Sequence, residues 1–273
     1  MRVNKDEVEF SRWLLNLGND TLPLFNDDEI SVPTNCHISQ NICKDVYGEL
    51  MLKKDYETIA QTAILTPTNE ASFELNAQIL DMLDGEEKTY VSFDSVEQNN
   101  DEVQYPVEFL NSIEDSSLPP HRLRVKKHAV VMLLRNLNLK QGLCNGTRME
   151  VSELANNVLI CKILTGDKKG SEVSIPRIPV ISNSEELPFA IVRHQFPVRI
   201  AYSMTINKSQ GQTFKRVGIC LKENVFSHGQ LYVAFSRVTS VHGIALSLPK
   251  QSDPSKLLLK NVVFQEVLRN ARK

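Results

Sequence analysis

The sequence contains no run of about 20 apolar residues, the length that a membrane-spanning helix needs. Its first residues, MRVNKDEVEFSRWLL, are too acidic and too short in apolar length for a secretory signal. The five cysteines, at positions 36, 43, 144, 161 and 220, are odd in number and form no CxxC pair. This pattern disfavours a disulfide framework or a zinc site and favours reduced thiols in a cytosolic or nuclear compartment.

Aromatic residues are also scarce, at 7% with a single tryptophan, so the sequence does not single out base-stacking side chains. The net charge of −2 is small but unevenly distributed. Residues 1–120 hold 7 Lys and Arg against 24 Asp and Glu, a net of −17, whereas residues 121–273 hold 24 against 9, a net of +15. A basic part of this size is typical of a polyanion-binding surface. Neutralisation of one part by the other is the alternative.

A chain of 273 residues with 41% hydrophobic residues can form one large domain or two smaller ones. Apolar residues at 10, 13, 14 and 17 predict an amphipathic helix over Phe10–Leu17, with Gly18 as its stop. Glu29–Val32 is a possible short strand, and Ile38–Leu50 is predicted to be partly helical. Near the other end, Gly243–Leu248 is predicted as a strand and Lys256–Ala271 as a helix.

A buried strand over Thr62–Leu65 is followed by a polar loop, Thr66–Asn69, in which Asn69 is predicted to cap a helix from Glu70 to Leu83. In α/β proteins, loops at the carboxyl ends of strands hold ligand-binding residues. The acidic, polar segment 96–105 and the residues up to Pro120 are predicted to form an exposed connector at a domain boundary.

After residue 120 the pattern changes to short strands separated by turns, which indicates a small β-barrel. Leu187–Ile200 is then predicted to return the chain to its first domain. The strands expected in the barrel are Arg122–Lys127, Ala129–Leu134, Met149–Leu154, Asn157–Leu164 and Glu172–Ile178, the last ending at Pro179.

Two later runs combine polar donors with an arginine. Met204–Phe214, MTINKSQGQTF, places hydroxyl, amide and lysine groups around a glycine before the strand predicted over Val217–Leu221. Such a loop can present backbone N–H groups to phosphate oxygens. His228–Val238, HGQLYVAFSRV, is apolar on one helical face and contains Arg237, whose permanent planar cation suits charge on a transferring phosphoryl group. These residues indicate phosphate handling, with an ordinary polar turn and a surface arginine as the alternative.

TINKSQGQT followed by GQLYVAFSR resembles motifs V and VI of the Pif-type superfamily-one DNA helicases. ILTPTN, followed by Asn76, is similar to motif IV, and VMLLRNLNLKQGLCNGTRMEV is similar to the entry of the family's barrel, called 2B. TINKSQGQT together with GLCNGTR most resembles the Helitron-transposon branch. The FxxWLLxxG pattern at 10–18 is similar to a segment that follows motif III, so the resemblance implies that the chain begins inside a longer protein.

The resemblance implies an α/β fold: a RecA-like domain of the P-loop-NTPase type, the second of the helicase core, with an inserted SH3-like β-barrel. Residues 1–120 are expected to form the first part of this domain, called 2A, with motif IV near 64–76. Residues 121–186 are expected to form the 2B barrel, and 187–273 the remainder of 2A with motifs V and VI.

By resemblance, Arg237 is the catalytic arginine finger that reaches the γ-phosphate of ATP, and Gly211, Gln212 and Thr213 lie near the nucleotide. Asn207 stands where many members have histidine. Arg148 is a further candidate for the DNA side of the barrel, and turn geometry explains the Asn145-Gly146 pair equally well. The residues expected to bind DNA are Thr66, Pro67, Asn69, Arg135, Asn145, Thr205, Asn207, Lys208, Ser209 and Gln210.

The sequence contains neither a GxxxxGK[ST] loop nor an Asp-Glu pair after a buried strand, which this class uses to hold ATP phosphates and Mg²⁺. The resemblance therefore implies the C-terminal part of an ATP-dependent 5′–3′ DNA helicase. ATP and Mg²⁺ would be held mainly by the absent first RecA-like domain, with no metal site in this chain. The isolated chain is accordingly predicted to be inactive as an ATP hydrolase.

The implied partners are single-stranded DNA, duplex junctions and the missing N-terminal helicase half, without a membrane. The implied location is the nucleus, and mitochondria as well in the family. Repair, recombination, telomere maintenance and transposition are all compatible with the resemblance. A non-catalytic nucleic-acid-binding module and a truncated, transposon-derived relic are the alternatives.

Overall fold

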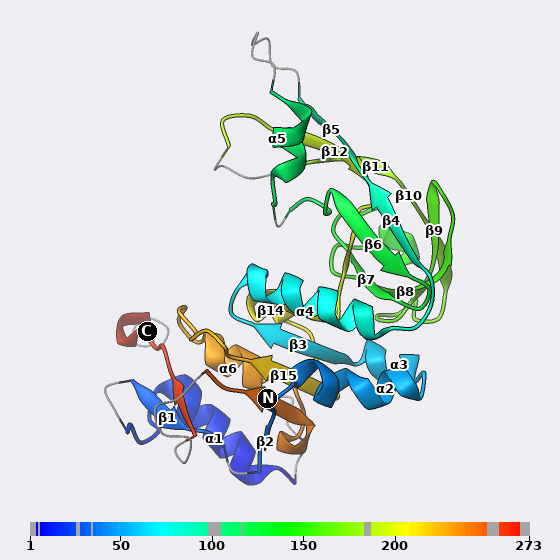
Figure 1. Cartoon of the computed structure of the whole chain (residues 1–273). Helices are drawn as coiled ribbons and strands as arrows, with labels where there is room; N and C mark the ends of the chain where they lie inside the picture. The colour runs from blue at the N-terminus through cyan, green and yellow to red at the C-terminus, as the bar shows by residue number, and fades with distance from the viewer. Residues whose placement is uncertain are drawn as a thin grey trace. The chain divides into compact units, whose positions relative to one another are not determined.

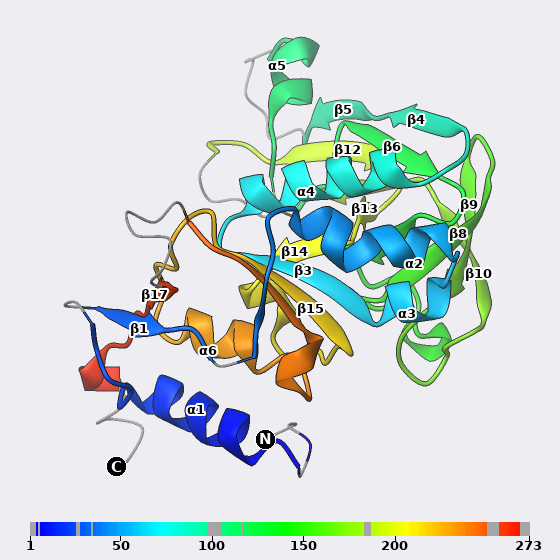
Figure 2. The same cartoon turned by 60° about the horizontal axis from the view of Figure 1, so that its bottom comes forward.

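A computed structural model of the chain describes residues 4, 6–25, 28–33, 35–97, 105–115, 117–182, 187–249 and 257–267. The chain folds into two units, whose elements are drawn in Figures 1 and 2. Unit 1 comprises Met1–Ile79 and Tyr202–Lys273, and unit 2 comprises Leu80–Ala201. The boundaries predicted from the sequence, 120/121 and 186/187, therefore both fall inside unit 2.

Unit 1 contains a five-stranded parallel sheet and a two-stranded antiparallel sheet. Its elements are α1 (Val8–Asn19), β1 (Glu29–Ser31), β2 (His37–Ile38), η1 (Lys44–Gly48), α2 (Glu49–Leu52), α3 (Tyr56–Ala60), β3 (Thr62–Thr66), α4 (Asn69–Met82, which crosses into unit 2), β14 (Ser203–Thr205), η3 (Asn207–Ser209), β15 (Arg216–Cys220), α6 (Gln230–Phe235), η4 (Val241–Gly243), β16 (Ile244–Ser247) and β17 (Leu258–Lys260).

The parallel sheet has the order β14-β3-β15-β16-β2 and is covered on both faces, which explains why β3 is buried at every position. Ala63 and Leu65 join the apolar cluster that includes residues of α1 and α6, two helices seen together in Figure 2. Ile64 faces the other way, toward Gly218 of β15. A Cβ added at Gly218 would lie 3.0 Å from Val46 Cγ2, so this glycine lets η1 approach the sheet closely.

The helix predicted over Phe10–Leu17 is present, but Gly18 does not end it. α1 continues to Asn19, and Asp20 adopts the left-handed conformation with a φ of 57°. A Cβ at Gly18 would lie 3.1 Å from the Tyr232 ring, so this glycine serves close packing against α6. The predicted strand at 29–32 and the helical segment within 38–50 are present as β1 and as η1 with α2.

The strand predicted over Thr62–Leu65 is confirmed as β3, and the helix after it as α4. Asn69 is the first residue of that helix and not its cap. The hydroxyl oxygen of Thr68 accepts the backbone N–H of Ala71 at 3.4 Å, so the capping group lies one residue earlier than predicted.

The helix predicted over 256–271 is wrong at its beginning. Leu258–Lys260 forms β17, which pairs antiparallel with β1 and places Leu259 opposite Ile30. This pairing buries Leu259, with 2% of its surface exposed, and overrides the helical spacing of the leucines. One helical turn follows at 265–267, whereas 256 and 268–271 lie outside the described residues. The predicted strand over 243–248 is confirmed as β16.

Unit 2 contains three antiparallel sheets, with the orders β10-β9-β8-β7-β13, β11-β12-β5 and β4-β6. Its elements are β4 (Glu87–Val91), β5 (Phe93–Val96), α5 (Val107–Ser112), β6 (Arg122–Lys126), β7 (Val130–Leu133), η2 (Leu139–Gln141), β8 (Arg148–Leu154), β9 (Val158–Ile163), β10 (Glu172–Pro176), β11 (Ile178–Ile181), β12 (Ile191–Gln195) and β13 (Val198–Ile200).

The strands predicted for the barrel are present, and their inward side chains, such as Val131, Met149 and Cys161, form one apolar cluster. Two details differ from the prediction. The strand expected to end at Pro179 splits into β10 and β11, and Pro179 lies within β11, opposite His194. In the described part of the chain no pairing joins the edge strands β10 and β13 to each other.

Strand pairing explains why the domain boundaries differ from the prediction. β6, predicted to open the barrel, pairs with β4, which precedes the supposed connector. β12 pairs with β5, and β13 pairs with β7, so residues 191–200 belong to unit 2 and the chain returns to unit 1 only at Tyr202. The residues after 104 are not an exposed linker, since α5 forms there and Leu110 and Leu118 are buried. Positions 98–104 and 116 lie outside the described residues.

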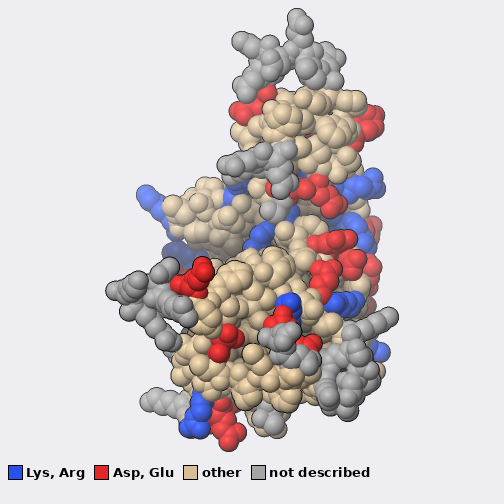
Figure 3. Space-filling model, turned by 90° about the vertical axis from the view of Figure 1, so that its left-hand side faces the viewer, with Lys and Arg blue, Asp and Glu red and all other residues tan. Residues whose placement is uncertain are grey.

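Oppositely charged residues of the acidic and basic parts of the sequence meet inside unit 2. Arg124 forms ion pairs with Asp81 at 2.5 Å and Glu87 at 2.7 Å, and its hydrogen bonds lower the pKa of Glu87. On the face drawn in Figure 3, basic and acidic side chains are interspersed and not gathered into separate fields. Partial neutralisation of one part by the other is therefore seen directly. Among the described residues, no helix has the length and apolar character that crossing a membrane requires.

Candidate functional site

Two loops leave the same edge of the parallel sheet in unit 1. β3 and β14 are parallel neighbours, with Thr66 opposite Thr205 at their carboxyl ends. The backbone N–H of Ile206 donates to the Thr66 carbonyl at 2.9 Å and joins the first residues of the two loops. The loops that resemble motifs IV and V therefore begin side by side, at the sheet edge where α/β proteins bind ligands.

The second loop, residues 206–213, turns its polar groups outward around a tight backbone. Ser209 is buried, and its hydroxyl donates to the Ile206 carbonyl at 2.6 Å. The N–H of Gln212 donates to the Ser209 carbonyl at 3.0 Å, and Gly211 between them has a φ of 84°, which favours glycine. The exposed residues of this loop are Asn207, Lys208, Gln210, Gly211 and Thr213.

Arg237, at the end of α6, contacts this loop directly. Its Nη1 donates to the Gln212 carbonyl at 3.1 Å and to the Ser209 carbonyl at 3.4 Å. Its Nε donates to the Val233 carbonyl at 3.0 Å. The two runs singled out in the sequence thus form one structure, in which a half-buried guanidinium lies against the backbone of the polar loop.

Gln230 is a site residue that the sequence analysis left without a role. It is 2% exposed, and its Oε1 accepts the backbone N–H of Phe226 at 3.1 Å. Its Nε2 donates to the Pro67 carbonyl at 3.5 Å and so joins α6 to the first loop. The available signal was a glutamine immediately before the apolar face of a helix, in a run already singled out.

Asn76 of α4 fixes the start of β14. Its Oδ1 accepts the backbone N–H groups of Tyr202 at 2.9 Å and Ser203 at 2.8 Å, and its Nδ2 donates to the Ser203 carbonyl at 2.9 Å. The side chain is 5% exposed. The sequence placed Asn76 in a motif, and the structure gives it a positioning role behind the site.

Burial divides the residues predicted to bind DNA. Thr66, Pro67, Thr205 and Ser209 have buried side chains, so a ligand at these positions would meet mainly their backbone. Asn69 and the second loop's Asn207, Lys208 and Gln210 are exposed in unit 1. Arg135 and Asn145 belong to unit 2.

Within unit 2, Arg148 does not line an outer surface as predicted. It is fully buried and donates from Nη2 to the Ala201 carbonyl at 2.9 Å, a structural role in the core of the sheet. Arg135 is half-exposed and donates to the Ile181 carbonyl at 2.5 Å. Asn145 is exposed in a turn whose backbone N–H donates to Asn136 Oδ1 at 2.8 Å.

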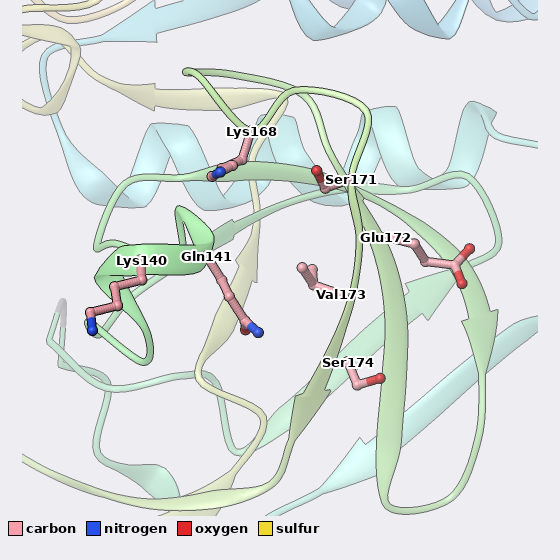
Figure 4. A pocket seen from close by; sticks show the side chains of 7 residues that line it. All are labelled: Lys140, Gln141, Lys168, Ser171, Glu172, Val173 and Ser174. Carbon is pink, nitrogen blue, oxygen red and sulfur yellow. The ribbon is translucent and has the colours of Figure 1, made fainter.

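An open cavity of about 560 Å³ lies in unit 2 between η2 and the turn before β10 (Figure 4). None of its lining residues belongs to the predicted site. The lining residues are Lys140, Gln141, Lys168, Ser171, Glu172, Val173 and Ser174.

The remaining reactive groups indicate no separate chemistry. All five cysteines are free, and burial raises the pKa of Cys36 to about 12 and of Cys43 to about 11, so these thiols stay protonated at neutral pH. Among the described residues, no three His, Cys, Asp or Glu side chains could hold a metal ion together.

Comparison with known proteins finds similarity to one group of helicases. The family model described as DNA helicase Pif1, 2B domain, matches residues 108–154. The ATP-dependent DNA helicase PIF1 of Xenopus laevis is 29% identical over 209 residues, which are 74% of this chain and 30% of that protein. The chain is similar to the Pif1 helicases over about three quarters of its length. The predicted assignment to a Helitron-like branch stays a prediction.

Two solved Pif1 structures share the fold. The crystal structure of Pif1 helicase from Candida albicans aligns with a TM-score of 0.64 and 21% identity, over 100% of this chain and 59% of that one. Pif1 helicase from Bacteroides in complex with ADP-AlF3 and ssDNA aligns with a TM-score of 0.59 and 18% identity, over 100% and 54%. The predicted α/β fold is confirmed. The chain spans about a third or less of the length of the curated Pif1 relatives that it matches.

Proposed function

We propose that this chain is the C-terminal part of an ATP-dependent DNA helicase that moves 5′–3′ on single-stranded DNA and unwinds duplexes. The observation that carries the proposal is the contact of the Arg237 guanidinium with the Gln212 carbonyl, in the loop that exposes Asn207 and Lys208. One loop thus touches both the candidate finger and the surface offered to DNA. The complex of the Bacteroides relative with ADP-AlF3 and ssDNA supports nucleotide and DNA as ligands of such a fold.

In this proposal Arg237 stabilises negative charge on the γ-phosphate during hydrolysis. In the structure its guanidinium donates to carbonyl oxygens, which are weaker acceptors than phosphate oxygens. A nucleotide phosphate within reach therefore draws Nη1 away from Gln212. Because Gln212 belongs to the loop that carries Lys208, this change reaches the DNA surface and couples hydrolysis to movement.

The exposed face of the second loop is proposed to bind the DNA backbone. Lys208 supplies a cation, and Asn207 and Gln210 supply amide donors, which are the groups that commonly contact phosphates. The phosphate-binding loop for ATP is not in this sequence, so the isolated chain is proposed to bind DNA without hydrolysing ATP.

Two exposed lysines of unit 1 are compared to test the DNA surface. Lys208→Ala changes the second loop, and Lys54→Ala, which precedes α3 and β3 and so lies toward the opposite edge of the sheet, is the control. Binding of a fluorescent oligothymidine is measured by anisotropy at several salt concentrations. Losing one phosphate contact lowers the slope of log Kd against log salt by about 1. Lys208→Ala is expected to show this loss and Lys54→Ala is not. Equal slopes for the two variants would contradict the assignment of the second loop to the DNA-binding surface.

A further inference from the structure

The sheet β11-β12-β5 of unit 2 has two unlike faces. Its inner face holds Arg193 and Asp94, at 1% and 2% exposed, with Arg193 Nη2 donating to Asp94 Oδ2 at 2.6 Å. Arg193 also donates to the carbonyls of Pro119 at 3.1 Å and Leu110 at 3.1 Å. This network ties the sheet to α5 and the segment that follows it. The strands that carry the outer face are therefore held in place by this network. Figure 1 labels two of them, β5 and β12.

Strand register aligns the outward side chains in two rows across the sheet. Phe93 of β5 lies opposite His194 of β12, and His194 lies opposite Pro179 of β11. The second row is Ser95, Val192 and Ile181 in the same strand order. Phe93 is 71% exposed, although a phenylalanine on a strand usually packs inward. The face thus presents an open aromatic ring beside an exposed imidazole.

Arginines border these two rows. Arg135 is held at one end by its 2.5 Å bond to the Ile181 carbonyl. At the other end, Val91 precedes Phe93 on the same side and pairs with Arg122, which is exposed. The six positions of the two rows include no carboxylate. The next acidic residue along the chain, Glu97, directly follows β5; it is exposed on the same face as Phe93 but lies beyond the second row.

We propose that this outer face is a second binding site for single-stranded nucleic acid, where bases stack on Phe93 and His194 and phosphates lie toward Arg122 and Arg135. A flat aromatic ring binds any base through its π-face, and the bordering guanidinium groups complement the backbone charge. The site goes beyond the proposed action of Arg237 and depends on that proposal only for the choice of DNA as the polymer. It lies in unit 2, on strands that carry none of the residues at the sheet edge of unit 1.

The test compares Phe93→Ala with Phe25→Ala, which removes an equally open phenylalanine, 59% exposed, from unit 1. Both variants and the wild-type chain are titrated with oligothymidine and with an abasic oligonucleotide of equal length. Loss of one stacked base weakens oligothymidine binding by about tenfold. Phe93→Ala is expected to show this loss with an unchanged salt slope and to match the wild type on the abasic strand. Phe93→Trp, which keeps an aromatic ring, is expected to bind at least as tightly as the wild type.

Three results would overturn the proposal. One is equal oligothymidine binding by Phe93→Ala and Phe25→Ala. Another is a loss in Phe93→Ala that persists on the abasic strand. The third is self-association of the wild type in gel filtration that Phe93→Ala abolishes, which would make the face a protein interface. The proposed function is judged separately, because it depends on the salt slope of Lys208→Ala and not on Phe93.

Discussion

Arg237 in unit 1 and Arg193 in unit 2 are both hydrogen-bonded arginines, yet their surroundings differ in kind. Arg193 is 1% exposed and bound to a buried carboxylate, Asp94, as well as to three carbonyls. Arg237 is half-exposed and donates to carbonyl oxygens of the loop it faces and to the Ser236 hydroxyl at 2.8 Å. Arg193 is buried in an ion pair that holds unit 2 together, whereas the Arg237 guanidinium is partly exposed and contacts the backbone of a surface loop.

The largest expected effect breaks the buried pair. Arg193→Ala leaves the Asp94 carboxylate in the interior without its cation, which costs about 3–5 kcal/mol of unfolding free energy. Arg237→Ala removes bonds to partly solvated carbonyls and is expected to cost about 1 kcal/mol. Urea unfolding followed by circular dichroism measures both, with the exposed helical Arg12→Ala as the control. Equal destabilisation by Arg193→Ala and Arg237→Ala would show that the two arginines contribute equally to stability, which contradicts this comparison.

A smaller effect is expected for His121, which contacts the same buried cluster through Ser92. The Ser92 hydroxyl donates to Asp94 Oδ1 at 2.5 Å and therefore accepts from His121 Nδ1, 2.8 Å away, so this ring nitrogen carries a proton. Burial lowers the pKa of His121, with Arg193 and Arg122 acting in the same direction and Asp94 opposing them.

Because the folded pKa of His121 lies below its unfolded value of about 6.5, the unfolded chain binds the proton first as the pH falls. The stability that neutral His121 contributes is complete above about pH 6.5 and is lost as the pH falls through the folded pKa, by at most about 1.4 kcal/mol per pH unit. Urea unfolding at pH 7.5 and 5.5 should show a smaller difference for His121→Gln than for the wild type. An equal or larger difference in the variant would assign the pH dependence to other groups.

Local sequence patterns predicted the individual helices and strands of this protein better than their grouping into domains. The buried run at 62–65 and the helical spacing at 10–17 depend on neighbouring residues, and both elements are present. The predicted domain boundaries differ from the bounds of the two compact units because β4 and β6 pair across the acidic segment, and no local pattern records a pairing over that distance. The helix predicted over 256–271 is wrong at its beginning for the same reason, because residues 258–260 pair with the distant strand β1.

The prediction of site residues shows the same difference between local sequence, which was informative, and long-range packing, which was not. Motif resemblance singled out residues 66–69, 204–213 and Arg237, and the strand register and the Arg237 contacts show that these residues lie at one sheet edge. Their roles stay predictions. Motif resemblance could not separate Arg148, which is fully buried, from half-exposed Arg135, because both are arginines in a strand-and-turn region of similar composition. Only the packing of the surrounding side chains distinguishes a structural arginine from one offered to a ligand.

The most direct test asks whether Arg237 acts on a nucleotide. In a chimera, this chain replaces the matching segment of Candida albicans Pif1 helicase. The fold of that segment is shared over the whole length of this chain. ATP hydrolysis stimulated by single-stranded DNA is then measured for the chimera and for its Arg237→Ala and Arg12→Ala variants. The account predicts hydrolysis by the chimera and by Arg12→Ala, and a loss of about a thousandfold in Arg237→Ala with DNA binding retained. Hydrolysis at the full rate by Arg237→Ala would contradict it.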